Sequence, residues 1–136
     1  MALRSANIIQ PVCQALLDGG DDSHAAAVTT WLKLAAQSAR LVTSNYVLVE
    51  TTAVAQHRLG VDAVRALVRD VIPLLDVVFV DETTHAAAVA ALLAAGRRHL
   101  SLVDCASFEV MRAAQVVTAF AYDRHFHEQG FEQPGR

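Results

Sequence analysis

Short runs of β-forming residues alternate with longer helical segments along this chain, and this alternation limits the folds open to it. Strands are expected at 6–9, 40–44, 77–80 and 116–121. A segment with helical spacing of apolar residues follows each of the first three. This order is typical of βαβ units around a parallel sheet. We therefore predict an α/β sandwich with a central parallel sheet of four to five strands flanked by helices.

Capping residues indicate where several helices begin. Thr43 or Ser44 is expected to cap a helix over 45–58, and Asp81 a helix that runs through Ala95. Further helices are expected after Pro11, from Asp22 or Ser23 to about Gln37, over 62–72, and from Ser101 to about Ala114. On the helix that ends near Gln37, the residues at core spacing are Val28, Trp31, Leu32 and Ala35.

Length and composition predict one compact domain. The chain has 136 residues, of which 54% are hydrophobic and 18% charged. A chain of this length supports one domain with a sizeable core. We therefore expect a single domain over 1–136, with an ordered core from about 6 to 131.

Charge and cysteine content exclude several protein classes. The net charge is −3 and Lys33 is the only lysine, so any binding of a polyanion must be local. Two cysteines, Cys13 and Cys105, are too few for a disulfide scaffold. No apolar run reaches the roughly 20 residues of a membrane span, and no signal peptide is visible at the start. A cytoplasmic protein is expected.

Three carboxylates fall at places where an acid needs a partner. Glu50 lies on an expected helix among apolar residues, Asp104 lies near the start of another helix, and Asp123 follows the last expected strand. Each alone has a structural explanation; Asp104, for example, completes the capping box that begins at Ser101. Together they fall on the same rim of the predicted sheet. Desolvated carboxylates that cluster usually share a cation, and oxygen ligands suit Mg²⁺ or Mn²⁺.

The sequence around these acids resembles that of PIN-domain proteins, in particular the VapC-type toxins of bacterial toxin–antitoxin pairs. The resemblance runs from about Leu16 to Phe131 and is carried by "LVTSNYVLVETTAVAQHRLG", "DETTHAAAVAALLAAGRRHLSLVDCASFEVMR" and "VVTAFAYDRHFHEQGFE". It implies a PIN-like three-layer sandwich and a metal-dependent ribonuclease. Glu50, Asp104 and Asp123 would then be the catalytic metal ligands for Mg²⁺ or Mn²⁺. The resemblance also implies RNA as substrate, a cognate antitoxin as partner and a homodimer.

The sequence departs from the family pattern at the end of the first strand. Family members carry an Asp there, followed by Thr or Ser, whereas this chain has Ile9, Gln10 and Pro11. Asp18, Asp21 and Asp22 come too late to replace it. The loss of one negative ligand should weaken metal binding. The alternative function is a PIN-fold module that binds RNA or a protein partner without cleaving.

Two basic clusters are candidates for contact with RNA phosphates. They precede the expected Asp104 helix and follow the last strand, and each residue alone is more simply explained as solvated surface charge. A contribution from Ser101 to substrate binding is also expected. The substrate-binding candidates are Ser101, Arg97, Arg98, Arg124 and His125. An NTPase is not expected, because the chain has no phosphate-binding glycine loop.

Overall fold

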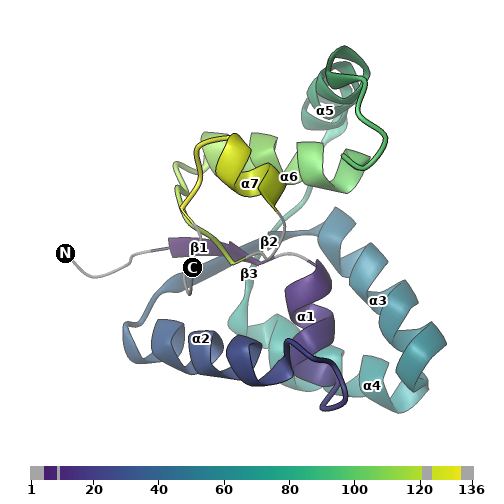
Figure 1. The fold of residues 1–136 in the computed structure, drawn as a ribbon, viewed down its shortest axis with the longest axis vertical. Coiled ribbons are helices and arrows are strands. Elements are labelled where there is room, and N and C mark those ends of the chain that lie inside the picture. Colours follow the sequence, from purple (N-terminus) through teal and green to yellow (C-terminus); the bar gives the residue numbers. More distant parts are fainter. Residues whose placement is uncertain (1–4, 9, 121–123, 133–136) are drawn as a thin grey trace.

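Four parallel strands form the centre of the molecule (Figure 1). The structure is a computed structural model that describes residues 5–8, 10–120 and 124–132. The strands are β1 (Ser5–Ile8), β2 (Arg40–Ser44), β3 (Asp76–Val78) and β4 (Ala119–Phe120). They lie in the order β3-β2-β1-β4, and every pairing is parallel. The predicted parallel sheet is thus confirmed, with four strands in the described part of the chain.

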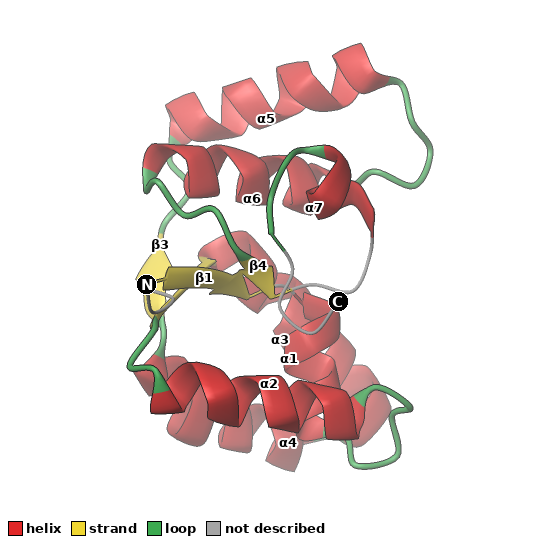
Figure 2. Ribbon diagram, turned by 60° about the vertical axis from the view of Figure 1, so that its left-hand side comes forward, coloured by secondary structure: helices red, strands yellow, loops and turns green. Residues whose placement is uncertain are grey.

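Helices cover both faces of the sheet (Figures 1 and 2). One face carries α1 (Gln10–Leu17), α2 (His24–Ala36), α3 (Asn45–Leu59) and α4 (Val61–Ala66). The other carries α6 (Leu102–Ala113) and α7 (Arg124–Glu128), and α5 (Glu82–Ala95) packs on the outside of α6. The three-layer arrangement predicted from the sequence is therefore confirmed. None of the helices in the described ranges is long and apolar enough to cross a membrane.

The core lies on both sides of the central strands. Residues 41–44 of β2 are all buried, as expected for a parallel strand with helices on both faces. Phe120 of β4 and Met111 of α6 are also fully buried. Burial of a large apolar side chain of this kind contributes roughly 1.5–3 kcal/mol. The sheet and α6 are therefore the most firmly held parts from which the site can be built.

The buried face of α2 differs from the predicted one. Ala27 and Leu34 are buried and Trp31 packs against the core, whereas Leu32 is 61% exposed and Ala35 is exposed. The prediction of Leu32 and Ala35 as core residues was therefore wrong. Residues 27, 31 and 34 lie on one face of a helix with 3.6 residues per turn. The buried face of α2 is therefore shifted by about one residue from the predicted face.

Side-chain caps begin the helices that follow β2 and β3. The Ser44 hydroxyl accepts a hydrogen bond from Val47 N at 3.3 Å, and Asp81 Oδ1 accepts one from Thr84 N at 2.8 Å. Both were predicted as caps, and both side chains satisfy backbone N–H groups that have no partner within the helix. At the other end of α5, Gly96 has φ 59°, a left-handed conformation that glycine adopts without strain.

Two strands are shorter than predicted. β3 ends at Val78 because Val80 N donates to Asn45 Oδ1 at 2.7 Å, which takes the chain away from the sheet. β4 begins only at Ala119, because Val116 N still bonds to Met111 O at 2.8 Å in the turn that ends α6. The predicted strand range 116–121 also includes residue 121, which lies outside the described residues.

The helix predicted over 62–72 changes its winding along its length. After α4 it continues as a π-helical turn, Leu67–Val71, and then as a 3₁₀ turn, Ile72–Leu74. Pro73 lies in that last turn and cannot donate a backbone hydrogen bond. The regular helix therefore ends earlier than the apolar pattern predicts.

The strand order fixes where a binding site can form. The chain runs outward from β1 to β2 and β3, and then returns to place β4 on the other side of β1. In open α/β sheets, ligands bind beyond the carboxyl ends of the strands at such a reversal. Of the predicted acids in the described residues, Glu50 lies on α3, which leaves β2 at this rim, and Asp104 lies at the start of α6.

Candidate acidic site

Glu50 is placed near the rim of the sheet by the direct passage from β2 into α3. The strand ends at Ser44, whose side chain caps the helix, so α3 starts with no intervening loop. Glu50 lies in the second turn of α3 and is half-buried. Its position is therefore fixed by a buried strand and a capped helix.

Asp104 is held at the start of α6 by a reciprocal capping box. Ser101 Oγ accepts from Asp104 N at 3.0 Å, and Asp104 Oδ2 accepts from Ser101 N at 3.2 Å. The predicted capping box is confirmed. It orients the Asp104 carboxylate in the first turn of a helix, where the backbone dipole favours a negative charge.

The carboxylates of Glu50 and Asp104 interact electrostatically. The pKa of Glu50 is raised, first by burial of the carboxyl group and then by the negative charge of Asp104. Helices α3 and α6 are in contact, which explains how residues far apart in the sequence feel each other's charge. The structure thus brings together two of the three predicted acids.

The third predicted acid, Asp123, lies outside the described residues, as does Ile9 at the end of the first strand. The flanking elements are described: β4 ends at Phe120 and α7 begins at Arg124. The role of Asp123 as a metal ligand therefore stays a prediction.

The described carboxylate pair fits a divalent cation. Both acids are half-buried, and burial followed by the charge of Asp104 raises the pKa of Glu50, so a positive ion between them would be favourable. Their oxygen atoms are ligands of the kind that Mg²⁺ and Mn²⁺ prefer. Within residues 5–8, 10–120 and 124–132 there is no group of three or more His, Cys, Asp or Glu side chains that could hold a metal. A complete ligand set would therefore need a residue such as Asp123.

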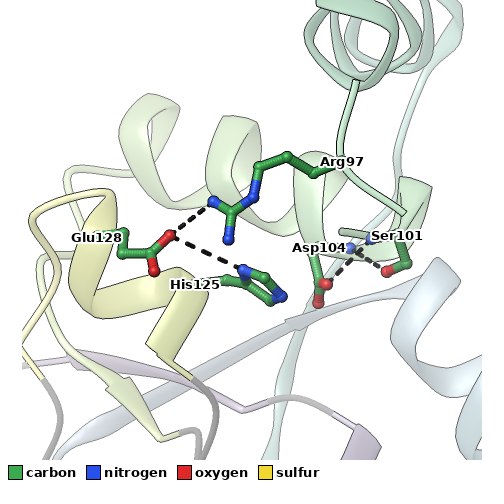
Figure 3. Close-up of polar contacts among 5 residues, drawn as sticks. All are labelled: Arg97, Ser101, Asp104, His125 and Glu128. Atoms are coloured by element: carbon green, nitrogen blue, oxygen red, sulfur yellow. Dashed lines mark hydrogen bonds and ion pairs between the residues drawn. The ribbon is translucent and has the colours of Figure 1, made fainter. Parts of the chain in front are cut away.

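A network of charged residues lies beside Asp104 (Figure 3). Arg97 Nη1 donates to Glu128 Oε2 at 2.6 Å, and His125 Nδ1 lies 4.0 Å from the same oxygen atom. Figure 3 shows the imidazole of His125 between Glu128 and Asp104. Arg97 and His125, predicted as substrate-binding residues, are thus close together, whereas Arg98 is exposed on the same loop as Arg97.

Glu128 was not identified from the sequence. Its partner Arg97 is 31 residues away along the chain, and no local pattern links the two. The only available signal was the acidic residue three positions after His125, on a segment expected to follow the last strand.

Both cysteines are poor nucleophiles. Cys13 and Cys105 are free and buried. Burial raises the pKa of Cys13 to about 12, and it also raises the pKa of Cys105, with the charges of Asp104 and Glu109 acting in the same direction. A thiol with a raised pKa is mostly protonated at neutral pH, so the chemistry of the site depends on its carboxylates.

Comparison with known proteins identifies the family. The family profile described as "PIN domain" matches residues 12–132. The 23S rRNA-specific endonuclease VapC20 of Mycobacterium tuberculosis, in strains CDC 1551 / Oshkosh and ATCC 25618 / H37Rv, is 35% identical over 120 residues, which cover 86% of this chain and 88% of VapC20. The crystal structure of VapC20, described as a sarcin–ricin loop cleaving toxin, superposes with a TM-score of 0.81 and 30% identity, covering 93% of this chain and 95% of that one. The chain therefore belongs to the PIN domain family, as a protein of the VapC type.

Proposed function

We propose that this protein is a divalent-metal-dependent endoribonuclease that hydrolyses RNA phosphodiester bonds. The observation that carries the proposal is the electrostatic coupling of Glu50 and Asp104 at the rim of the sheet. PIN-domain nucleases of the VapC type generally depend on divalent metals. Glu50, Asp104 and Asp123 would hold Mg²⁺ or Mn²⁺ as the catalytic ligands.

The roles of the described residues follow from where they lie, whereas Arg124 is assigned from the sequence alone. A bound divalent ion supplies a Lewis acid that stabilises negative charge on the reacting phosphate. Glu50 and Asp104 contribute charged oxygen ligands, and Ser101 fixes the Asp104 carboxylate through the capping box. The side chains that would hold flanking phosphates are Arg97, Arg98, Arg124 and His125, with Ser101 at the edge of the site.

The similarity to VapC20 suggests a first RNA to test. That protein is described as a 23S rRNA-specific endonuclease and as a sarcin–ricin loop cleaving toxin. VapC toxins in general act on RNA and pair with VapB antitoxins. We infer that this chain cleaves a structured RNA hairpin of the sarcin–ricin type in the cytoplasm and is held inactive by a cognate antitoxin.

One observation favours a second candidate function. The match to the family profile begins at residue 12, after the strand end where Ile9 and Gln10 stand in place of the usual acid. With one negative ligand fewer, metal affinity is expected to be weaker. The second candidate is therefore a PIN-fold module that binds RNA or a partner protein without cleaving it.

The deciding experiment is cleavage of a labelled sarcin–ricin hairpin in Mg²⁺ or Mn²⁺. The wild-type chain should cut the hairpin, and Asp104→Asn should reduce the rate at least about 100-fold, because an anionic ligand is replaced by a neutral one. Asp62→Asn is a matched control, since Asp62 is exposed on α4 and pairs only with Arg65 among the described residues. Binding of the hairpin without any cleavage in Mn²⁺ would support the non-catalytic module.

Exposed apolar residues support a homodimer. Val49 and Phe79 are 70% and 74% exposed, and both line a hollow of about 410 Å³ on the outer side of α3. Exposed apolar side chains gathered around one hollow offer a contact surface for a second copy of the chain. The mass in solution tests this: Phe79→Asp should convert a dimer to a monomer, and a wild-type chain that is already monomeric would contradict it.

A further inference from the structure

Helix α7 is fixed against the middle of α6 by aromatic packing. Phe126 is fully buried, and its ring lies edge-on to that of Phe108, with the centroids 4.9 Å apart. Phe108 is one helical turn after Asp104 on α6, and His125 directly precedes Phe126 on α7. Figures 1 and 2 both show α7 lying along α6. This packing places the polar residues of α7 next to the acidic site.

A single carboxylate on α7 lies close to basic side chains from two segments. Glu128 Oε2 accepts a hydrogen bond from Arg97 Nη1 at 2.6 Å, and it faces His125 Nδ1 at 4.0 Å. Arg97 comes from the loop between α5 and α6, and His125 from α7 itself. Glu128 thereby ties this loop to α7 on the side of α6 where Asp104 lies (Figure 3).

We propose that Glu128 is a positioning residue for RNA binding, which holds the Arg97 guanidinium by a hydrogen bond beside Asp104 and next to the His125 imidazole, as a preformed phosphate-binding arm. The inference rests on the proposed function and adds to it a residue that contacts neither metal nor RNA. A guanidinium has five N–H donors, and Glu128 accepts from one of them, so others can reach a phosphate. His125 turns its Nδ1 edge to Glu128, which directs the opposite edge, with Nε2, toward the Asp104 side (Figure 3).

The physical gain is preorganisation. An arginine side chain on a surface loop loses much rotamer freedom when it binds a ligand. A side chain already held in place loses less. Arg97 is 43% exposed and His125 only 12% exposed, so the arm is ordered yet open to solvent at the arginine.

The effect of removing Glu128 on RNA affinity distinguishes a positioning role from a purely electrostatic one. Glu128 is negative, so removing it should strengthen RNA binding if only the local charge matters. If Glu128 positions the arm, its removal should weaken binding even though the surface becomes more positive. The two explanations therefore predict opposite changes in the Kd for RNA.

The test measures binding of the labelled sarcin–ricin hairpin in EDTA by fluorescence anisotropy. Glu128→Ala should raise the Kd roughly fivefold, about the effect of disordering one charged phosphate contact. Glu128→Gln keeps an oxygen that can accept from Arg97 and should stay within about twofold of wild type. Asp62→Ala, which breaks an exposed ion pair of the same 2.6 Å length on α4, should leave the Kd unchanged.

A double mutant shows whether Glu128 acts through Arg97. If it does, Arg97→Ala with Glu128→Ala should bind no more weakly than Arg97→Ala alone. In Mn²⁺, Glu128→Ala should raise KM and leave kcat nearly unchanged. The thermal midpoint of each variant separates loss of the arm from loss of the fold, and Glu128→Gln remains informative if the alanine variant does not fold.

An unchanged or lower Kd in Glu128→Ala, or additive effects in the double mutant, overturns the positioning role. Because binding is measured without metal, a wild-type chain that binds the hairpin but fails to cut it contradicts the ribonuclease and leaves the test of Glu128 intact. A wild-type chain that does not bind the hairpin at all contradicts both.

Discussion

Burial of the Glu50 carboxyl group on α3 raises its pKa, and the negative charge of Asp104 on α6 raises it further. Neither residue contributes favourably to folding through this interaction, since two like charges brought together cost free energy. A pair of acids that opposes folding is typical of a functional site, where stability is given up for binding or catalysis.

Replacement of Glu50 by glutamine should therefore stabilise the metal-free protein. Between the pKa of Glu50 in the unfolded state and its higher pKa in the folded state, the folded protein binds more protons than the unfolded protein. The free energy of unfolding therefore falls as the pH rises through this range. Above both pKa values the whole penalty is present, so Glu50→Gln should raise the free energy of unfolding at pH 7, by less than about 1 kcal/mol because the side chain is partly solvated.

Urea unfolding at pH 4 and pH 7 measures this effect. The difference between Glu50→Gln and wild type should be larger at pH 7 than at pH 4, where the wild-type carboxyl group is largely protonated. Glu82→Gln is a suitable control, because Glu82 is exposed at the start of α5. A glutamine variant that is less stable at pH 7 than at pH 4, relative to wild type, would contradict the inferred repulsion.

The capping box makes Ser101 important for both stability and activity. Ser101→Ala removes the acceptor for Asp104 N and leaves the carboxylate less firmly oriented. We expect a loss of about 1 kcal/mol in stability, the usual cost of losing a helix cap. RNA cleavage should fall as well, through kcat, because Asp104 is a proposed metal ligand.

The threonine variant separates the two consequences. Ser101→Thr keeps a capping hydroxyl and should restore most of the stability and of kcat. Ser44→Ala, which removes the cap of α3, serves as a comparison for stability alone. If Ser101→Ala changes KM for RNA while kcat and stability stay the same, Ser101 acts on substrate and its capping role is unimportant for the reaction.

Addition of Mn²⁺ should stabilise the wild-type protein against heat. A ligand that binds only the folded state adds RT ln(1 + [L]/Kd), about 2.7 kcal/mol at 100 times the Kd. The increase in Tm should disappear in Asp104→Asn and in Glu50→Gln, because each removes one charged ligand. Mn²⁺ titration by differential scanning fluorimetry at constant ionic strength measures this, and an equal increase in all three proteins would show that the ion binds elsewhere.

Features that depend on neighbouring residues could be predicted from the sequence. The caps at Ser44 and Asp81 and the Ser101–Asp104 box follow from residue types three positions apart, and the structure has all of them. The order of strands and helices was also predictable, since apolar spacing distinguishes the two over most of the chain.

Features that depend on distant contacts were not predictable. The apolar spacing of α2 fits two stripes, and only packing against the sheet selects Leu34 over Leu32. The early end of β3 depends on Asn45 of α3, 35 residues before Val80. The same holds for the candidate site: acids at a strand or helix end were visible in the sequence, whereas Glu128 gains its role only from Arg97, which lies on another segment.

The end of the first strand offers a test of how far the proposed metal site depends on the missing acid. β1 ends at Ile8 and α1 begins at Gln10, beside β4 at the point where the strand order reverses. Open α/β sheets bind ligands beyond the carboxyl ends of strands at such a reversal, so an acid added here is a candidate further ligand. We therefore expect Ile9→Asp or Gln10→Asp to tighten Mn²⁺ binding by roughly tenfold, through one more charged oxygen ligand.

Isothermal titration with Mn²⁺ compares the two variants with wild type and with Thr29→Asp, an acid added at an exposed position on α2. Only the variant whose new carboxylate reaches the site of Glu50 and Asp104 should bind more tightly, and its cleavage of the hairpin should increase in parallel. If neither Ile9→Asp nor Gln10→Asp binds better than Thr29→Asp, then the first strand does not border the metal site, because another carboxylate in an incomplete oxygen shell should raise the affinity. A gain in metal affinity without a gain in cleavage would instead place the remaining deficiency in the contacts to RNA.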